Sequence, residues 1–409
     1  MAEFPVDQVR AAFPALQDGF LFFDNAAGAQ APATVLDAVA YHLLHRNVQR
    51  GGRYRQSQEV DQAIASARSS VALLVNARHP GEICFGMNAT SFMRLISLAI
   101  GQSLKDRREI IVTDLDHEAN IAVWLALERE GAKIVWWHFR DDGRLHPDDL
   151  ERLLSPRTRI VACTLASNAI GSILDVADVS RLAHAAGAEV FIDAVHYGPH
   201  GTIDVQAFGC DYLVCSGYKI FSPHMGFLWG RRETLDALPT FREEFVPNTT
   251  PAKLEIGTYI YENVAGMDAA VLYLEDLGRR INPNATSRRA ALVACAEAIR
   301  SYEMQLSCAM LDVLAKVNAT VYGITAKDRI SHRTPTLCFN LPGISPDKVT
   351  EALATQNICV RDGHMYSPRL MKRLGLSPES GAVRASLVHY NTLEEVHRFG
   401  SSLAKMTGH

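Results

Sequence analysis

The sequence predicts an α/β fold, with a mostly parallel seven-stranded sheet followed by a smaller C-terminal α+β domain. Through the first half of the chain, short apolar runs alternate with amphipathic helical patterns, which is typical of a parallel sheet covered by helices. From about residue 264 the pattern becomes helical, and it then mixes short strands with one more helix. We therefore expect a large domain that ends near residue 263 and a small domain over residues 264–409.

Seven apolar runs are the candidate strands of the sheet, and four amphipathic patterns are the helices between them. The strands are Glu82–Phe85, Glu109–Thr113, Lys133–Phe139, Arg159–Leu165, Glu189–Asp193, Tyr212–Ser216 and Gly226–Trp229. The helices are Val60–Leu74, Ala119–Glu130, Pro147–Leu154 and Val176–Ala186. In the C-terminal part we expect helix from Val264 to Val317 with a break near Asn282-Pro283-Asn284, strands at Leu337–Leu341, Ile358–Arg361 and Val383–Val388, and a helix at Thr392–Leu403.

Composition narrows the class of protein. The chain has 409 residues, 48% apolar and 21% charged, and its net charge of −4 argues against binding to nucleic acid or to a membrane surface. No apolar stretch reaches the roughly 18 residues that cross a bilayer, and the first ten residues contain no apolar signal region. The eight cysteines include no C-x-x-C pair, which favours reduced thiols. We expect a cytoplasmic protein.

Two polar sequences follow predicted strands and carry the first candidate site residues. Lys219 ends Ser216-Gly217-Tyr218-Lys219 and is followed by apolar and small residues, so burial could lower the pKa of its amine and free it to form an imine. Asp193 and His196 lie at the end of the predicted strand Glu189–Asp193, which comes before the strand that leads to Lys219. A carboxylate there could face a pyridinium nitrogen. A solvated lysine and a helix-capping aspartate are the alternatives.

Three further strand ends carry polar residues. Phe85-Gly86-Met87-Asn88-Ala89-Thr90-Ser91 opens a helix whose free N–H groups could bind phosphate, or it is an ordinary helix cap. His117 could stack on a cofactor ring, or it could simply lie at the surface. Asn168 could bridge a cofactor oxygen and a substrate carboxylate, or it could form a turn. Since the five sets lie at the ends of five of the seven predicted strands, we expect them to converge on one site.

At these residues the sequence resembles the class V aminotransferase superfamily, specifically group II cysteine desulfurases and selenocysteine lyases. The resemblance covers nearly the whole chain, and proteins described as cysteine desulfurase-like share Asp-Ala-Val-His-Tyr and Leu-Val-His-Tyr-Asn. The motifs that carry it are Phe23-Asp24-Asn25-Ala26-Ala27-Gly28, Asn47-Val48-Gln49-Arg50-Gly51, Asp116-His117-Glu118-Ala119-Asn120, Ser167-Asn168, Asp193-Ala194-Val195-His196, Ser216-Gly217-Tyr218-Lys219 and Val383-Arg384-Ala385-Ser386.

The resemblance implies fold type I of the enzymes that depend on pyridoxal 5′-phosphate (PLP), with a large PLP-binding domain over residues 21–263. Residues 1–20 would then join residues 264–409 in the small domain. It also implies a homodimer with active sites at the interface, to which Gly257-Thr258 of one subunit contributes by reaching the phosphate of the other, and a small amino acid as substrate.

The same resemblance implies a role for each site residue. Lys219 would hold PLP as a Schiff base and move protons, with His117 and Asp193 as the other catalytic residues. Cofactor contacts are implied for Asp193 at the ring nitrogen, His117 at the ring face, His196 and Asn168 at ring oxygens, and Asn88, Ala89, Ser216, Tyr218 and Thr258 at the phosphate. Substrate contacts are implied for Arg384 at the α-carboxylate, with Asn168, Arg361, Arg53 and Ala27. No metal site is expected.

Two positions depart from the desulfurase pattern. Where those enzymes carry a nucleophilic cysteine, this chain has Tyr366, at the end of Arg361-Asp362-Gly363-His364-Met365-Tyr366. A phenol cannot form a persulfide, and Cys359 precedes Arg361 in an apparent strand. Arg53 replaces a histidine; Arg53, Arg361 and His364 could favour an acidic substrate side chain, or these arginines are solvated or paired with Asp362 and Glu262.

Three functions follow from these residues. The first is a lyase that releases sulfur or another β leaving group without a persulfide cysteine. The second is a class V aminotransferase, epimerase or decarboxylase-type enzyme in a biosynthetic pathway, which the Tyr366 replacement keeps open. The third is a non-catalytic binding or scaffold protein, which the presence of Lys219, Asp193 and Arg384 disfavours.

Overall fold

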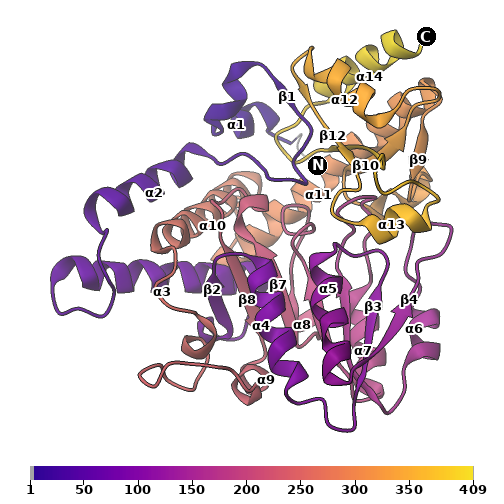
Figure 1. Cartoon of the computed structure of the whole chain (residues 1–409). Coiled ribbons are helices and arrows are strands. Elements are labelled where there is room, and N and C mark those ends of the chain that lie inside the picture. The colour runs from indigo at the N-terminus through magenta and orange to yellow at the C-terminus, as the bar shows by residue number, and fades with distance from the viewer. Residues whose placement is uncertain (1–3, 409) are drawn as a thin grey trace.

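A computed structural model describes residues 4–408, and its main feature is the seven-stranded sheet that the sequence predicts (Figure 1). All neighbouring strands are parallel except β8, which is antiparallel to both of its neighbours. The order across the sheet is β2 (Ile83–Gly86), β8 (Gly226–Gly230), β7 (Tyr212–Ser216), β6 (Glu189–Asp193), β5 (Thr158–Thr164), β3 (Glu109–Thr113) and β4 (Lys133–Trp137).

Helices cover both faces of this sheet, because successive side chains of each strand point to opposite faces. On β5, Ile160 and Ala162 join one apolar core, whereas Val161 and Cys163 join the other. The first core includes α4 (Ala89–Gly101), α5 (Ala119–Leu125) and α9 (Arg232–Ala237). The second includes α3 (Arg55–Val75), α6 (Pro147–Leu153), α7 (Val176–Ala185), α8 (Val205–Phe208) and α10 (Tyr261–Ile281).

The C-terminal part forms a second, smaller α+β unit (Figure 1). Its sheets are an antiparallel one, β12 (Arg361–Gly363), β13 (Ala382–Ser386), β10 (Thr336–Asn340) and β9 (Thr320–Tyr322), and a parallel pair, β1 (Leu21–Phe22) with β11 (Ile358–Cys359). The third apolar core packs them against α11 (Arg288–Lys316), α12 (Pro346–Ala354) and α14 (Leu393–Thr407). The remaining helices are α1 (Val6–Ala11), α2 (Ala33–His45) and α13 (Pro368–Arg373), with 3₁₀ turns at Pro14–Asp18, Pro80–Glu82, Ala126–Glu130, Gly217–Lys219, Ala252–Leu254 and Lys327–His332.

One predicted strand is wrong as a single element. Ile358–Arg361 divides into β11, which pairs with β1, and β12, which pairs with β13 in the other sheet. The chain bends between them at Val360, so the apolar run serves two sheets. The predicted helix Ala119–Glu130 also changes type, because its second half is a 3₁₀ turn after α5.

The N-terminal segment contacts elements of both parts of the chain. Phe4 stacks on Tyr302 of α11, with ring centroids 4.6 Å apart, and Arg10 forms an ion pair with Glu395 of α14. Phe13, in contrast, packs edge-on against Phe221 and Tyr273. The domain boundaries stay a prediction, and residues 1–3 lie outside the described part of the chain.

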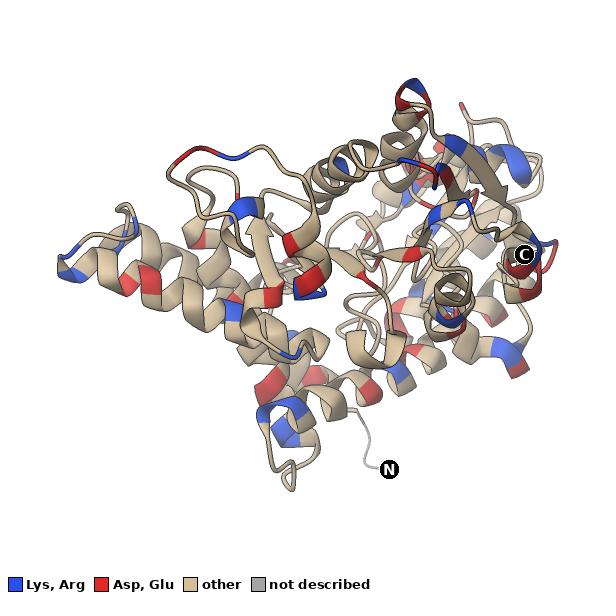
Figure 2. Ribbon diagram, turned by 90° about the horizontal axis from the view of Figure 1, so that it is seen from below, with Lys and Arg blue, Asp and Glu red and all other residues tan. Residues whose placement is uncertain are grey.

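Charge and helix hydropathy are unremarkable for a globular chain. Figure 2 shows acidic and basic residues interspersed along the ribbon, in keeping with the net charge of −4. Among the described helices, none is long and apolar enough to span a bilayer.

The cap of α14 generates a stability prediction. The Thr392 hydroxyl accepts from the Glu395 N–H, and the Glu395 carboxylate accepts from the Thr392 N–H, each at 3.1 Å. We expect Thr392→Ala to lower the free energy of unfolding by about 1 kcal/mol, because an N–H at the helix start loses its partner. Chemical denaturation measures this. Thr392→Ser retains the cap and should be close to wild type; an equal loss in both variants would contradict the capping role.

Candidate active site

The carboxyl ends of the parallel strands meet at a cavity, as the sequence predicts. Its lining residues come from the ends of β5, β6 and β7, from the start of α4 and from the turn after β3. They are Ala89, Thr90, Met93, His117, Ala119, Thr164, Ala166, Asn168, Asp193, Val195, His196, Ser216, Tyr218 and Lys219. Residues more than 100 positions apart in sequence thus surround one space.

Lys219 lines this cavity and ends the 3₁₀ turn Gly217–Lys219, which follows β7. The residue is 6% exposed, and burial, reinforced by the charge of Arg384, lowers the pKa of its amine to about 8. Its Nζ lies 5.8 Å from the centre of the Tyr218 ring, and no described side chain forms a hydrogen bond or ion pair with it. A sizeable fraction of this amine is therefore neutral and nucleophilic near neutral pH.

Asp193 and His196 follow β6 and face the same cavity. Burial raises the pKa of the Asp193 carboxyl to about 6, while a hydrogen bond from the Val195 N–H (2.9 Å) and the Lys219 charge oppose the shift. The His196 Nε2 lies 3.2 Å from the Thr334 hydroxyl and 3.1 Å from that of Thr336. Burial lowers the pKa of His196 well below its usual value, so the imidazole is neutral. A buried carboxylate gains from a cationic partner placed against it.

The start of α4 has the features of an anion-binding turn. Asn88 caps the helix by accepting the Ser91 N–H at 2.8 Å, and the next residue, Ala89, lines the cavity. Gly226 of β8 lets the strand approach this turn, since a Cβ there would lie 2.4 Å from the carbonyl carbon of Asn88. Ser216 and Tyr218 also line the cavity. A helix start beside hydroxyl groups suits a phosphate.

His117 lines the cavity, and its ring stacks on the ring of Tyr366. The ring centroids are 5.5 Å apart with an interplanar angle of 29°. The His117 Nδ1 accepts from the Ala119 N–H at 3.0 Å, and burial, with the charges of Lys219 and Arg384, lowers the pKa of His117 to about 4. The imidazole is therefore neutral, with its remaining proton on Nε2.

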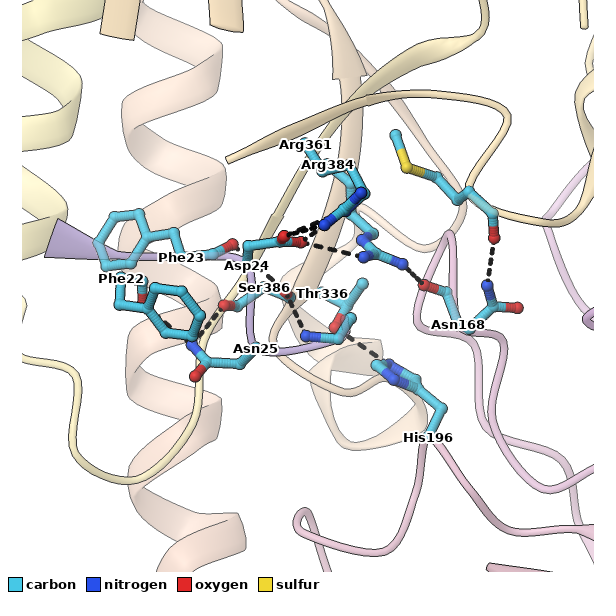
Figure 3. Close-up of polar contacts among 12 residues, drawn as sticks. Phe22, Phe23, Asp24, Asn25, Asn168, His196, Thr336, Arg361, Arg384 and Ser386 are labelled. Atoms are coloured by element: carbon cyan, nitrogen blue, oxygen red, sulfur yellow. Dashed lines mark hydrogen bonds and ion pairs between the residues drawn. The ribbon is translucent and has the colours of Figure 1, made fainter. Parts of the chain in front are cut away.

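Asp24 joins the two arginines that the sequence suggests for substrate binding (Figure 3). Its carboxylate accepts two hydrogen bonds from Arg361, with Nε at 3.0 Å and Nη2 at 2.8 Å, and one from the Arg384 Nη2 at 3.2 Å. Arg384 also donates from Nη1 to the Asn168 carbonyl at 2.9 Å. One carboxylate thus faces two guanidinium groups, which leaves one positive charge in excess. Arg361 pairs with Asp24 and not with Asp362 or Glu262, whereas Arg53 is exposed, as the alternative of solvated arginines allows.

Several predicted site residues make other contacts within this chain. The Asn168 amide donates to the Met365 carbonyl at 2.7 Å and accepts from the Ser367 hydroxyl at 3.0 Å (Figure 3 draws the first). Arg53 lies exposed, and Thr258 accepts a hydrogen bond from Gln49 at 2.6 Å, also away from the cavity. Ala27, which donates its N–H to the Asp24 carbonyl, is absent from the cavity lining. The roles assigned to these residues stay predictions.

No cysteine lines the cavity, and the candidate substitute lies elsewhere. Cys359 is half-buried in β11, and burial, followed by the Asp24 charge, raises the pKa of its thiol. The side chain of Tyr366, which stacks on His117, is 54% exposed. Sequence reasoning had given no role to Asp24, Thr334 or Thr336. The quoted Phe23-Asp24-Asn25 motif was the available signal for the first, whereas nothing local marked the two threonines.

Comparison with known proteins agrees with this geometry. The family model for class-V aminotransferases matches residues 21–399, and the chain belongs to this family of PLP-dependent lyases and transferases. The chain is 35% identical over 407 residues to the aminotransferase-like protein FGM3 of Gibberella zeae, covering 97% of this chain and 96% of that protein. It is 33% identical over 425 residues to a cysteine desulfurase of Synechococcus elongatus, covering 98% of this chain but 64% of that protein.

Solved structures confirm the predicted fold class. An apo cysteine desulfurase from Thermococcus onnurineus NA1 aligns with a TM-score of 0.88 at 26% identity, covering 100% of this chain and 99% of that one. The fold is that of type I PLP enzymes, as predicted. The family resemblance stated from the motifs is confirmed as well.

The Asp24 carboxylate generates a prediction. Arg384 is 1% exposed, so removing the charge of its partner would leave a buried guanidinium without compensation. We expect Asp24→Asn to lower the free energy of unfolding by about 3–5 kcal/mol. Asp178→Asn is the matched control, because it breaks an exposed pair with Arg181 and should cost less than about 1 kcal/mol. Chemical denaturation compares the two variants, and equal small losses would show that Arg384 does not depend on Asp24.

Proposed function

We propose that this chain is a PLP-dependent enzyme that acts on an amino acid and releases a leaving group, such as sulfur, from the β-carbon without a persulfide-forming cysteine. The observation that supports it best is the buried, unpaired amine of Lys219 in a cavity with the Asp193 carboxylate and no thiol. The family membership supports the cofactor and the class of reaction.

The residues present fit PLP in charge and in shape. Lys219 supplies an amine that can bind an aldehyde, Asp193 supplies an anion for the ring nitrogen, and the α4 start with Ser216 and Tyr218 supplies donors for a phosphate. His117 and His196, both neutral, would contact the ring face and a ring oxygen. When bound, PLP supplies an electron sink for a carbanion at the substrate α-carbon.

The chain's own groups account for the other requirements of the reaction. Lys219, once neutral, takes the α-proton of the substrate, which its lowered pKa favours near neutral pH. The excess positive charge of Arg361 and Arg384 over Asp24 attracts the substrate α-carboxylate. Tyr366 stands where the resemblance to desulfurases implies the nucleophilic cysteine, so the leaving group would pass to solvent rather than to a persulfide.

We also propose a homodimer in which Thr258 reaches the partner's site. Two observations support it. Thr258 lies away from the cavity of its own chain, and α2 exposes Leu36, Leu43 and Leu44 to 50%, 48% and 77%. Exposed apolar patches of this kind are typical of protein interfaces.

A transamination-type reaction is the second candidate. The Gibberella zeae relative is described as an aminotransferase-like protein, and the Tyr366 replacement removes the group that defines a desulfurase. Both candidates use the same amine and the same electron sink, so products separate them.

Lys219→Ala tests the site itself. Removing the amine should abolish the absorbance of covalently held PLP near roughly 410–430 nm, because no other lysine lines the cavity. Lys219→Arg, which keeps a positive charge, should lose the band equally. A band retained in either variant would remove Lys219 from this role.

Incubation of the purified protein with single amino acids tests the reaction. Pyruvate together with sulfide or sulfite is the expected product set for a β-lyase. Conversion of the cofactor to its pyridoxamine form, dependent on a keto acid, would favour the aminotransferase instead. No spectral change with any amino acid would refute both.

A further inference from the structure

The loop that carries Tyr366 has an unusual backbone. Met365 and Tyr366 are consecutive residues with left-handed φ angles of 53° and 59°. Bulky side chains rarely adopt this region, and two in succession are retained only where surrounding contacts impose the conformation. Such outliers cluster at ligand-binding and catalytic positions.

Four hydrogen bonds hold the loop in this conformation. The Asn168 amide donates to the Met365 carbonyl at 2.7 Å, and the Glu118 N–H donates to the Tyr366 carbonyl at 2.8 Å. The Tyr366 N–H donates to the His364 Nδ1 at 3.0 Å. The Ser367 hydroxyl donates to the Asn168 Oδ1 at 3.0 Å. Two of the partners, Glu118 and Asn168, follow strands that end at the cavity.

The phenol lies beside the cavity rather than in a core, because it stacks on the lining residue His117, although Tyr366 is not itself among the lining residues. Met365 is 2% exposed and anchors the loop, whereas Tyr366 is 54% exposed. The phenol ring stacks on His117 at 5.5 Å and meets the edge of His364 at 6.1 Å.

We propose that Tyr366 is a catalytic acid whose phenol hydroxyl protonates the group leaving the substrate β-carbon. This inference rests on the proposed β-lyase function and names the residue that takes the place of the desulfurase cysteine. The backbone of this loop is strained, and four hydrogen bonds hold it in place beside the lining residue His117. A contact between the Tyr366 side chain and the substrate would explain this arrangement.

The step balances without any additional reactant. The electron pair left at the α-carbon forms a double bond to the β-carbon as the bond between the β-carbon and the leaving atom breaks. The pair of the broken bond stays on the leaving atom. The proton moves from the Tyr366 oxygen to the same atom, so a thiol leaves as a neutral molecule. Because the residue is half exposed, the phenolate regains its proton from water. Lys219 keeps the separate proton taken from the α-carbon.

The test compares two leaving groups in wild type and Tyr366→Phe. Chloride is a weak base that departs from 3-chloro-L-alanine without a proton, whereas methanethiolate from S-methyl-L-cysteine needs one. General acids contribute about 10²–10⁴-fold, so Tyr366→Phe should slow pyruvate release from S-methyl-L-cysteine by at least about 100-fold. Release from 3-chloro-L-alanine should change less than about 3-fold, since no proton is required.

Two controls separate chemistry from structure. The variant should keep the wild-type cofactor band and the same spectral titration with L-alanine, which has no leaving group, because phenylalanine retains the stack on His117. Tyr41→Phe, at a tyrosine that is 48% exposed on α2, should match wild type with both substrates.

The contrary outcomes are distinct. Equal slowing with both substrates, or loss of the L-alanine response, would assign Tyr366 a structural role and overturn the proposal. No slowing with either would show that the phenol donates no proton. If wild type releases pyruvate from neither compound, the proposed β-lyase function and this inference both fail.

Discussion

Burial of the Lys219 amine beside the Asp193 carboxylate is the constraint on which the site depends. Asp193 ends β6, and Lys219 ends the 3₁₀ turn that follows β7, the parallel neighbour of β6. The sheet withdraws the amine from water, which lowers its pKa, and withdraws the carboxylate, which raises its pKa. Each group is thus moved toward its neutral form in the isolated chain. A neutral amine can attack an aldehyde, whereas a ring cation placed against Asp193 would stabilise the ionised carboxylate.

A second constraint joins the N-terminal segment to the C-terminal sheet. Asp24 lies just after β1, whereas Arg361 and Arg384 belong to β12 and β13, so the three-residue cluster fixes β1 against the antiparallel sheet. The Asn168 carbonyl, which accepts from Arg384, extends this link to the end of β5. The charged groups that we propose for substrate binding therefore also join the N-terminal segment, the antiparallel sheet and the end of β5.

The loop after β12 brings Tyr366 next to the residues at the strand ends. Lys219, Asp193 and His117 line the cavity, and the phenol of Tyr366 stacks on His117. A phenol can exchange a proton but cannot carry sulfur. Under the function proposed above, this chain therefore differs from a desulfurase in what happens to the leaving group and not in how the substrate is activated.

The sequence by itself determined the strands, because apolar runs of four to seven residues have few other stable uses. It also determined the edge at which the site lies, because the carboxyl ends of parallel strands meet there. It therefore predicted that Lys219, Asp193, His117 and Ala89 lie together. Only the tertiary structure decided what depends on distant pairing: Asp24 meets Arg384 across 360 positions, and β11 and β12 enter different sheets. The sequence also could not predict the left-handed φ angles at Met365 and Tyr366. Neither residue type favours that conformation, and contacts with residues that follow other strands impose it.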